Sequence, residues 1–221
     1  MNKTYKFNMS SVNLMGPGCL NEIGGEILSL GLKKALIVIA KMLVKIGLID
    51  KLTGVLGERC IDYAIFDKTQ PNPTVKNIED GLTILKENNC DFIISFGGGS
   101  PHDCTKGIGI VASNGGCIKN YEGVNKSKKS MFPLVAINTT AGTASKMTKF
   151  CIITDEDRHI KMTIVDNHTT PTVSINDPLL IIEKPASLTA ATGMSALTHA
   201  IEAFVSTQAT PITGACVLMA I

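Results

Sequence analysis

The fold of this 221-residue chain is decided by one stretch, Asp91-Phe92-Ile93-Ile94-Ser95-Phe96-Gly97-Gly98-Gly99-Ser100-Pro101-His102-Asp103. Its first five residues form a short apolar run that is typical of a buried parallel strand. Helical spacing of apolar residues follows, with Ser100 predicted as the N-cap and Pro101 as the first helical residue. Because three glycines separate the strand from the helix, backbone N–H groups can approach an anion there. The stretch predicts a pyrophosphate cradle, and a simple glycine turn is the alternative.

Composition and charge narrow the class of protein. Hydrophobic residues make up 44% of the chain, and no apolar run reaches the ~18 residues that span a bilayer. The net charge is +2, and the scattered lysines form no basic stripe for nucleic acid. Seven cysteines without a C-x-x-C spacing are typical of reduced thiols, and the N-terminus lacks the apolar segment of a signal peptide. We therefore expect a soluble cytoplasmic protein that binds neither nucleic acid nor membranes.

Apolar runs alternate with segments of helical spacing along the chain. Strands are predicted at residues 34–39, 63–66, 91–95, 134–138 and 172–177, and helices at 20–30, 43–56, 74–88 and 103–112. This alternation predicts an α/β fold with a parallel sheet covered on both faces. In such sheets ligands bind beyond the carboxyl ends of the strands, where the glycine loop and Pro71-Asn72-Pro73 both fall.

The remaining segments are predicted from composition. Residues 150–154 and 160–165 are two strand-like runs that predict a hairpin, and the polar residues 113–130 predict a surface loop. From about Ser187 onward the sequence changes to an alanine-rich helix, which places a domain boundary near residues 180–186.

Three further groups of side chains are candidates for a site, each with a structural alternative. Ser195 and His199 lie one helical turn apart, a spacing used by metal ligands, but only His199 is a credible ligand and a lone helical histidine is more often structural. The hydroxyls of Thr139 and Thr140 can serve a cofactor or cap a turn. The charge of Lys161 can reach a cofactor or extend into solvent from an edge strand.

Four longer motifs stand at residues 96–103, 138–143, 175–178 and 188–203. Together they resemble the iron-containing (group III) alcohol dehydrogenases, in the branch of the 1,3-propanediol and lactaldehyde dehydrogenases. The resemblance runs from near residue 8 to the last residue. It implies a dinucleotide-binding α/β domain at residues 1–182, followed at 183–221 by the first part of an all-helical metal-binding domain. This is the two-domain plan of dehydroquinate synthase-like proteins.

The resemblance also implies a set of site residues. An NAD or NADP cofactor would be bound by Asn72, Gly98, Gly99, Ser100, Asp103, Thr139, Thr140 and Lys161. Ala40 stands where many members of the family carry an Asp that meets the adenosine ribose, so both cofactors remain open. Fe²⁺ would be held by His199, while Ser195 stands where the family has a ligand Asp. No catalytic residue is assigned.

The activity that the resemblance implies is hydride transfer between a small primary alcohol or diol, or the corresponding aldehyde, and NAD(P). In the family the metal polarises the alcohol oxygen. In the family, two more histidines from farther along the helical domain complete the metal site. No histidine follows His199 in this sequence, so we expect a helical domain truncated before those two ligands. The alternative is a nucleotide-binding pseudoenzyme without turnover. The related dehydroquinate synthase and glycerol dehydrogenase group is less favoured by the Thr-Thr-Ala-Gly-Thr string. Apolar helix at 187–221 predicts self-association, and we expect a homo-oligomer.

Overall fold

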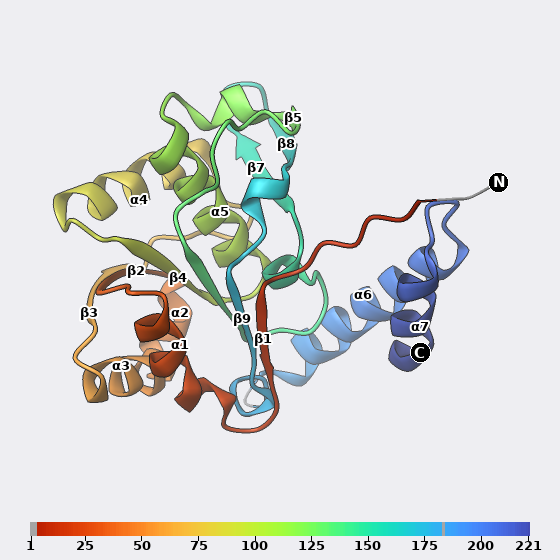
Figure 1. Cartoon of the computed structure of the whole chain (residues 1–221), viewed down its shortest axis with the longest axis horizontal. Helices are drawn as coiled ribbons and strands as arrows, with labels where there is room; N and C mark the ends of the chain where they lie inside the picture. Colours follow the sequence, from red (N-terminus) through yellow and green to blue (C-terminus); the bar gives the residue numbers. More distant parts are fainter. Residues whose placement is uncertain (1–3, 183) are drawn as a thin grey trace.

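The computed structural model describes residues 4–182 and 184–221. A six-stranded parallel sheet in the order β1-β9-β6-β4-β2-β3 forms its centre (Figure 1). The strands are β1 (Val12–Met15), β2 (Lys34–Ile39), β3 (Asp62–Phe66), β4 (Phe92–Gly97), β6 (Leu134–Asn138) and β9 (Val173–Asn176). This arrangement confirms the predicted α/β class.

Helices cover both faces of the sheet because its strands are apolar on both sides. Alternate residues of β2 enter two separate core clusters, with Ile37 and Ile39 in one and Leu36 and Val38 in the other. The first cluster is closed by α1 (Ile23–Ser29) and α3 (Leu48–Glu58), and the second by α4 (Val75–Glu87) and α5 (Gly99–Asn114).

The helix predicted at residues 43–56 is two helices. The short helix α2 (Lys41–Lys45) ends just before Gly47, which has a φ of 74° and is followed by α3. Glycine tolerates this left-handed conformation, which ends one helix and turns the chain into the next. The predicted helix at 20–30 likewise begins as a 3-10 helix, η1 (Cys19–Glu22), before α1.

A small second sheet packs beside α5. Its strands are β5 (Gly123–Val124), β7 (Phe150–Asp155) and β8 (Ile160–Val165), in the order β5-β8-β7. The antiparallel pairing of β7 with β8 confirms the predicted hairpin. Residues 113–130 are not loop throughout, because they contain β5 and η2 (Ile118–Tyr121). Ile118 and Tyr121 are buried in the cluster under α5, which a polar loop would not provide.

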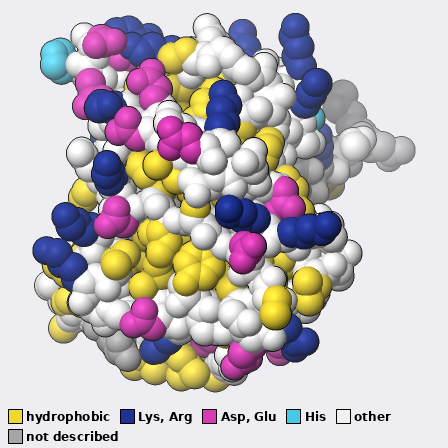
Figure 2. Space-filling view, turned by 90° about the vertical axis from the view of Figure 1, so that its left-hand side faces the viewer, with side chains coloured by type: hydrophobic (Ala, Val, Ile, Leu, Met, Phe, Trp, Pro, Cys, Tyr) yellow, Lys and Arg dark blue, Asp and Glu magenta, His cyan; other side chains and the backbone are white. Residues whose placement is uncertain are grey.

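Charges of both signs cover the outside of the sheet domain. Figure 2 shows dark-blue and magenta side chains interspersed on the face that lies at the left in Figure 1, with apolar side chains between them. The edge strand β3 contributes exposed Tyr63 and Ile65 to the molecular surface. No helix in the described ranges is long and apolar enough to cross a membrane.

The chain ends in two helices that project from the sheet domain (Figure 1). Helix α6 (Ala186–Val205) follows the short η5 (Pro178–Leu180), and it packs against α7 (Pro211–Ala220). Among the residues of these two helices, Ala200 and Val217 are the buried ones. The helical character expected from about Ser187 is confirmed. The predicted domain boundary remains a prediction, and residue 183 within it lies outside the described residues.

Candidate functional site

The glycine loop joins the carboxyl end of β4 to α5 at the middle of the sheet. The N-cap of α5 is Gly98, so the prediction of Ser100 as N-cap is wrong. The chain enters the helix two residues earlier, and Pro101 occupies the first turn, where backbone N–H groups have no intrahelical partner in any case. Gly97 has a φ of 151°, and a Cβ there would lie 2.7 Å from Pro101 Cγ. This position therefore requires glycine.

The loop after β6, residues 139–144, is called the threonine loop here, and it packs directly on the glycine loop. The Thr139 backbone N–H donates to the Gly97 carbonyl oxygen at 2.9 Å. A Cβ at Gly98 would lie 2.8 Å from Thr140 Oγ1, closer than real Cβ contacts allow. The absence of a side chain at Gly98 is thus what lets the two loops meet. The structure brings the predicted residues Gly98, Thr139 and Thr140 together.

A cavity of about 430 Å³ opens beside these two loops. It lies at the carboxyl ends of β2, β4 and β6, the edge at which parallel sheets bind ligands. Its walls are mostly apolar, and the side chains with polar atoms are Thr139, Thr140 and Lys184. Ala40, which follows β2, also lines it. An apolar cavity with a few placed polar groups is typical of a cofactor site.

Asn72 links the glycine loop to the small sheet. Lys161 Nζ donates to Asn72 Oδ1 at 2.8 Å, and the Asn72 backbone N–H donates to Ser100 Oγ at 3.3 Å. Asn72 has a φ of 57°, a left-handed conformation that Asn adopts more readily than most residues. Three residues predicted from distant motifs therefore form one connected group, with Lys161 exposed to solvent.

Asp103 belongs to a buried hydrogen-bond network and does not line the cavity. Its Oδ1 accepts a hydrogen bond from Ser145 Oγ at 2.7 Å. Burial raises the pKa of the Asp103 carboxyl, and the charge of Lys106 opposes this shift. A contact between Asp103 and the cofactor stays a prediction.

Lys106 is the centre of that network. Its side chain is fully buried, and Nζ donates to the carbonyl oxygens of Ser145, Thr148 and Phe150 at 2.6, 2.8 and 2.7 Å. Burial lowers the pKa of Lys106 to about 8, and the Asp103 carboxylate opposes the shift. Lys106 thereby ties α5 to the turn that follows the threonine loop. Sequence reasoning missed it, although a lysine on the apolar side of a predicted helix was a signal.

His102 is buried beside the same network. Its Nδ1 lies 2.7 Å from Ser95 Oγ on β4. Burial lowers the pKa of His102 to about 3, and the positive charges of Lys106 and Lys146 add to the shift. The imidazole is therefore neutral at physiological pH and holds the first turn of α5 against the sheet.

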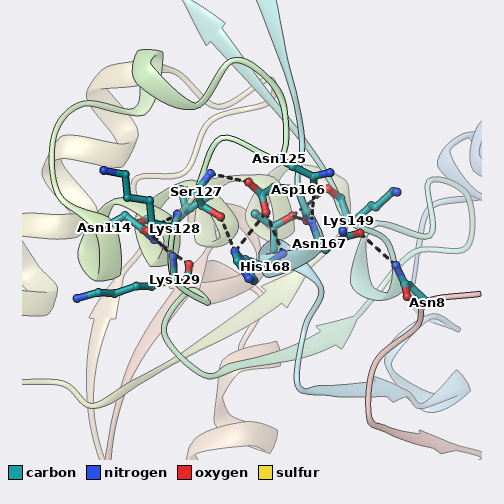
Figure 3. Close-up of polar contacts among 12 residues, drawn as sticks. Asn8, Asn114, Asn125, Ser127, Lys128, Lys129, Lys149, Asp166, Asn167 and His168 are labelled. Carbon is teal, nitrogen blue, oxygen red and sulfur yellow. Dashed lines mark hydrogen bonds and ion pairs between the residues drawn. The ribbon is translucent and has the colours of Figure 1, made fainter.

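A Ser–His–Asp group lies elsewhere, and its geometry is not that of a catalytic triad (Figure 3). Ser127 Oγ lies 2.7 Å from His168 Nδ1, and Asp166 Oδ1 lies 3.6 Å from the same nitrogen. In a triad the serine and the carboxylate use opposite nitrogens of the imidazole. Asp166 instead accepts from the backbone N–H groups of Ser127 and His168, at 2.9 and 3.0 Å. The group fastens the 113–130 segment to the protein.

The predicted metal ligand is exposed. His199 lies on the solvent side of α6, with Ser195 one turn earlier. Across residues 4–182 and 184–221, no group of three or more His, Cys, Asp or Glu side chains is placed to hold a metal ion. The described residues therefore do not form a complete iron site, and the metal role of His199 stays a prediction.

The fold and the cavity define an α/β protein that has a ligand-sized cavity at the carboxyl edge of a parallel sheet and two helices after the sheet. Residues 11–178 match the sequence family described as iron-containing alcohol dehydrogenase. Residues 189–221 match the C-terminal part of the Fe-containing alcohol dehydrogenase family. The chain belongs to the iron-containing alcohol dehydrogenase family.

Individual relatives agree with the predicted branch. The chain is 56% identical over 215 residues to alcohol dehydrogenase 4 of Schizosaccharomyces pombe, covering 97% of this chain and 51% of the relative. It is 47% identical over 221 residues to 1,3-propanediol dehydrogenase of Klebsiella pneumoniae, covering 99% and 57%. A crystal structure of 1,3-propanediol oxidoreductase superposes with a TM-score of 0.95 at 47% identity, covering 98% of this chain and 56% of that one. The chain spans about half the length of the curated relatives it matches.

Proposed function

We propose that this chain carries the cofactor-binding half of an NAD(P)-dependent alcohol dehydrogenase. The reaction would transfer a hydride between nicotinamide and a small primary alcohol or diol. One observation carries the proposal: the glycine loop and the threonine loop meet at a largely apolar cavity on the ligand-binding edge of a parallel sheet. The names of relatives support both the cofactor and the substrate class, among them an NAD-dependent methanol dehydrogenase of Bacillus methanolicus, 46% identical over 214 residues.

The residues present fit a dinucleotide. Gly98 is the N-cap of α5 and lines the cavity, and the first backbone N–H groups of a helix have no intrahelical partner and can bind a phosphate. Gly98, Gly99 and Ser100 are proposed to hold the diphosphate, and Thr139 and Thr140 to line its path along the cavity. Lys161, positioned by Asn72, supplies a cation at the exposed end. When bound, the nicotinamide supplies the hydride acceptor or donor.

The choice between NAD and NADP is proposed to be weak. Ala40 lines the cavity at the end of β2 and offers no carboxylate to bind a ribose 2′-hydroxyl or repel a 2′-phosphate. Titration with NADH and NADPH tests this, since a wild-type preference of about a hundredfold, or ~2.7 kcal/mol, would place selection on another residue. The variant Ala40→Asp is expected to shift the preference toward NADH.

Fe²⁺ is proposed as the metal of the complete protein, with His199 as one ligand. The family description supports iron. The other ligands would have to come from outside the described residues, so no chemical step is assigned to the metal here.

A second candidate function is nucleotide binding without turnover. Ser195 favours it, because a neutral hydroxyl next to His199 is a poor ligand for a divalent metal.

Two measurements on the 221-residue chain test these functions. NADH is first titrated while its fluorescence is followed, and saturable binding is expected; a folded chain that binds neither NADH nor NADPH would contradict both candidates. NAD⁺, Fe²⁺ and 1,3-propanediol are then combined, and NADH formation is followed. We expect no turnover from this chain, because the described residues lack a complete metal site. Turnover would show that this chain does form a working metal site, and it would rule out nucleotide binding without turnover.

The proposal extends to where the protein is located and whether it self-associates. We propose a cytoplasmic protein, a location supported by seven cysteines that are all free thiols in the described chain. We also propose a homo-oligomer, which the exposed apolar side chains of α6 and α7 support.

A further inference from the structure

Lys184 occupies an unusual position between the sheet domain and α6. It lines the 430 Å³ cavity together with Gly98 and Thr140, although it comes from the segment after η5. Of the described residues that line this cavity, Lys184 is the one that carries a charge. Sequence motifs did not single it out, because nothing local marks it as part of the glycine-loop site.

The ammonium group of Lys184 is held in place by Thr192. Lys184 Nζ donates to Thr192 Oγ1 at 2.8 Å. The Thr192 hydroxyl itself donates to the Leu188 carbonyl oxygen at 2.8 Å, so a lone pair of Oγ1 faces the ammonium. Thr192 lies against the threonine loop, because a Cβ at Gly142 would come within 3.2 Å of the Thr192 carbonyl oxygen. The linker, α6 and the threonine loop therefore meet at the cavity.

A dinucleotide in this cavity needs positive charge near its diphosphate. The glycine loop offers neutral N–H groups and the partial charge of a helix N-terminus, equivalent to about half an elementary charge. Lys106 is buried with its ammonium engaged by three carbonyl oxygens, and Lys161 is held at Asn72. Neither of them lines the cavity.

We propose that Lys184 is a further cofactor-binding residue that pairs with the diphosphate of the dinucleotide, and that Thr192 positions its ammonium. This inference rests on the proposed function. A charged hydrogen bond from Lys184 adds to the neutral donors of the glycine loop and neutralises charge in a largely apolar cavity. Because Thr192 belongs to α6, the diphosphate would also be linked, through Lys184, to the first helix after the sheet domain.

The test compares two probes on the full 221-residue chain. ADP-ribose contains the diphosphate, whereas adenosine lacks it. In the variant Lys184→Met, the affinity for ADP-ribose is expected to fall about tenfold, while that for adenosine stays unchanged. Lys184→Arg should retain most of the affinity. Thr192→Val should show a smaller loss that is specific for ADP-ribose, because it removes only the acceptor that orients Lys184.

A control variant shows whether the effect is specific to Lys184. Lys41→Met removes an exposed lysine next to Ala40 that does not line the cavity, and it should leave both affinities unchanged. The affinity of the wild-type chain for ADP-ribose should fall more steeply with salt than that of Lys184→Met. Wild-type ADP-ribose binding by Lys184→Met, or equal losses for both probes, would overturn the inference and leave the proposed function intact. A wild-type chain that binds neither ADP-ribose nor NADH would overturn the proposed function as well.

Discussion

Lys161 and Asn72, 89 positions apart in the sequence, are joined by a hydrogen bond of 2.8 Å from Nζ to Oδ1. The bond connects the small sheet to the segment before α4, and the backbone N–H of Asn72 extends the connection to Ser100. An exposed lysine would otherwise sample many rotamers. The hydrogen bond to Asn72 therefore holds the Lys161 ammonium beside the glycine loop.

Removing either member of this pair should weaken cofactor binding. Lys161→Met is expected to lower the NADH affinity about tenfold, because a positioned cation is lost. Asn72→Gly should have a smaller effect of the same sign, since glycine keeps the left-handed backbone and removes only the acceptor. Fluorescence titration measures both. Lys76→Met, on the exposed side of α4, is the matched control. NADH affinity unchanged in Lys161→Met would remove Lys161 from the site.

A methyl group at Gly98 should disturb the cavity without unfolding the protein. In Gly98→Ala the new Cβ would lie 2.8 Å from Thr140 Oγ1, so the threonine loop must move. We expect NADH affinity to fall more than tenfold, or ~1.4 kcal/mol. Gly54→Ala is the matched control, because nothing lies within 4 Å of a Cβ at that position. If a folded Gly98→Ala protein bound NADH as tightly as the wild type, the proposal that the glycine loop holds the diphosphate would be wrong.

Lys106→Met should destabilise the fold strongly. The substitution leaves the carbonyl oxygens of Ser145, Thr148 and Phe150 without their donor, and it leaves Asp103 without a nearby cation. Breaking a buried charged group out of such a network costs about 3–5 kcal/mol of unfolding free energy. Urea unfolding measures it. Lys76→Met should change the same quantity by less than about 0.5 kcal/mol, and a similarly small change in Lys106→Met would contradict the role of Lys106.

His102 should make stability depend on pH in mildly acidic solution. Its folded-state pKa of about 3 lies below the ordinary value of 6.5. The unfolded chain therefore binds a proton first as the pH falls, and stability is lost between about pH 6.5 and 3. The loss approaches about 1.4 kcal/mol per pH unit. His102→Gln should flatten this slope, whereas His159→Asn, at an exposed histidine, should not. Identical slopes in wild type and His102→Gln would refute the prediction.

The helices α6 and α7 should drive self-association. Several large apolar side chains on them are exposed, including Phe204 at 53% and Leu218 at 68%. Exposed apolar surface of this extent favours association. Light scattering should show species larger than a monomer, and replacing Phe204 and Leu218 by Ser should shift them toward the monomer. Leu28→Ser, at an exposed residue of α1, should not. A wild-type chain that stays monomeric at high concentration would contradict this prediction.

Local patterns in the sequence determined most strands of the parallel sheet and several of its helices. β2 begins and ends at Lys34 and Ile39 as predicted, because an uninterrupted apolar run suits a strand buried on both faces. Thr74, the first residue of the helix predicted at 74–88, is the N-cap of α4, and its Oγ1 accepts from the Asn77 backbone N–H at 3.2 Å. A helix cap is decided within one turn, so its signal is present in neighbouring residues. The motif-based family assignment was confirmed for the same reason, since its motifs are contiguous.

Only the tertiary structure decided which distant groups meet. The acceptors of Lys106 lie 39 to 44 positions along the chain, and no local pattern indicates that their carbonyl oxygens surround an ammonium. The start of α5 at Gly99 was likewise missed, because the predicted cap at Ser100 considered local preference alone, whereas the threonine loop packs on Gly98. Burial and long-range hydrogen bonding set these positions. Both depend on how the strands are ordered in the sheet, and that order is not contained in any one segment of the sequence.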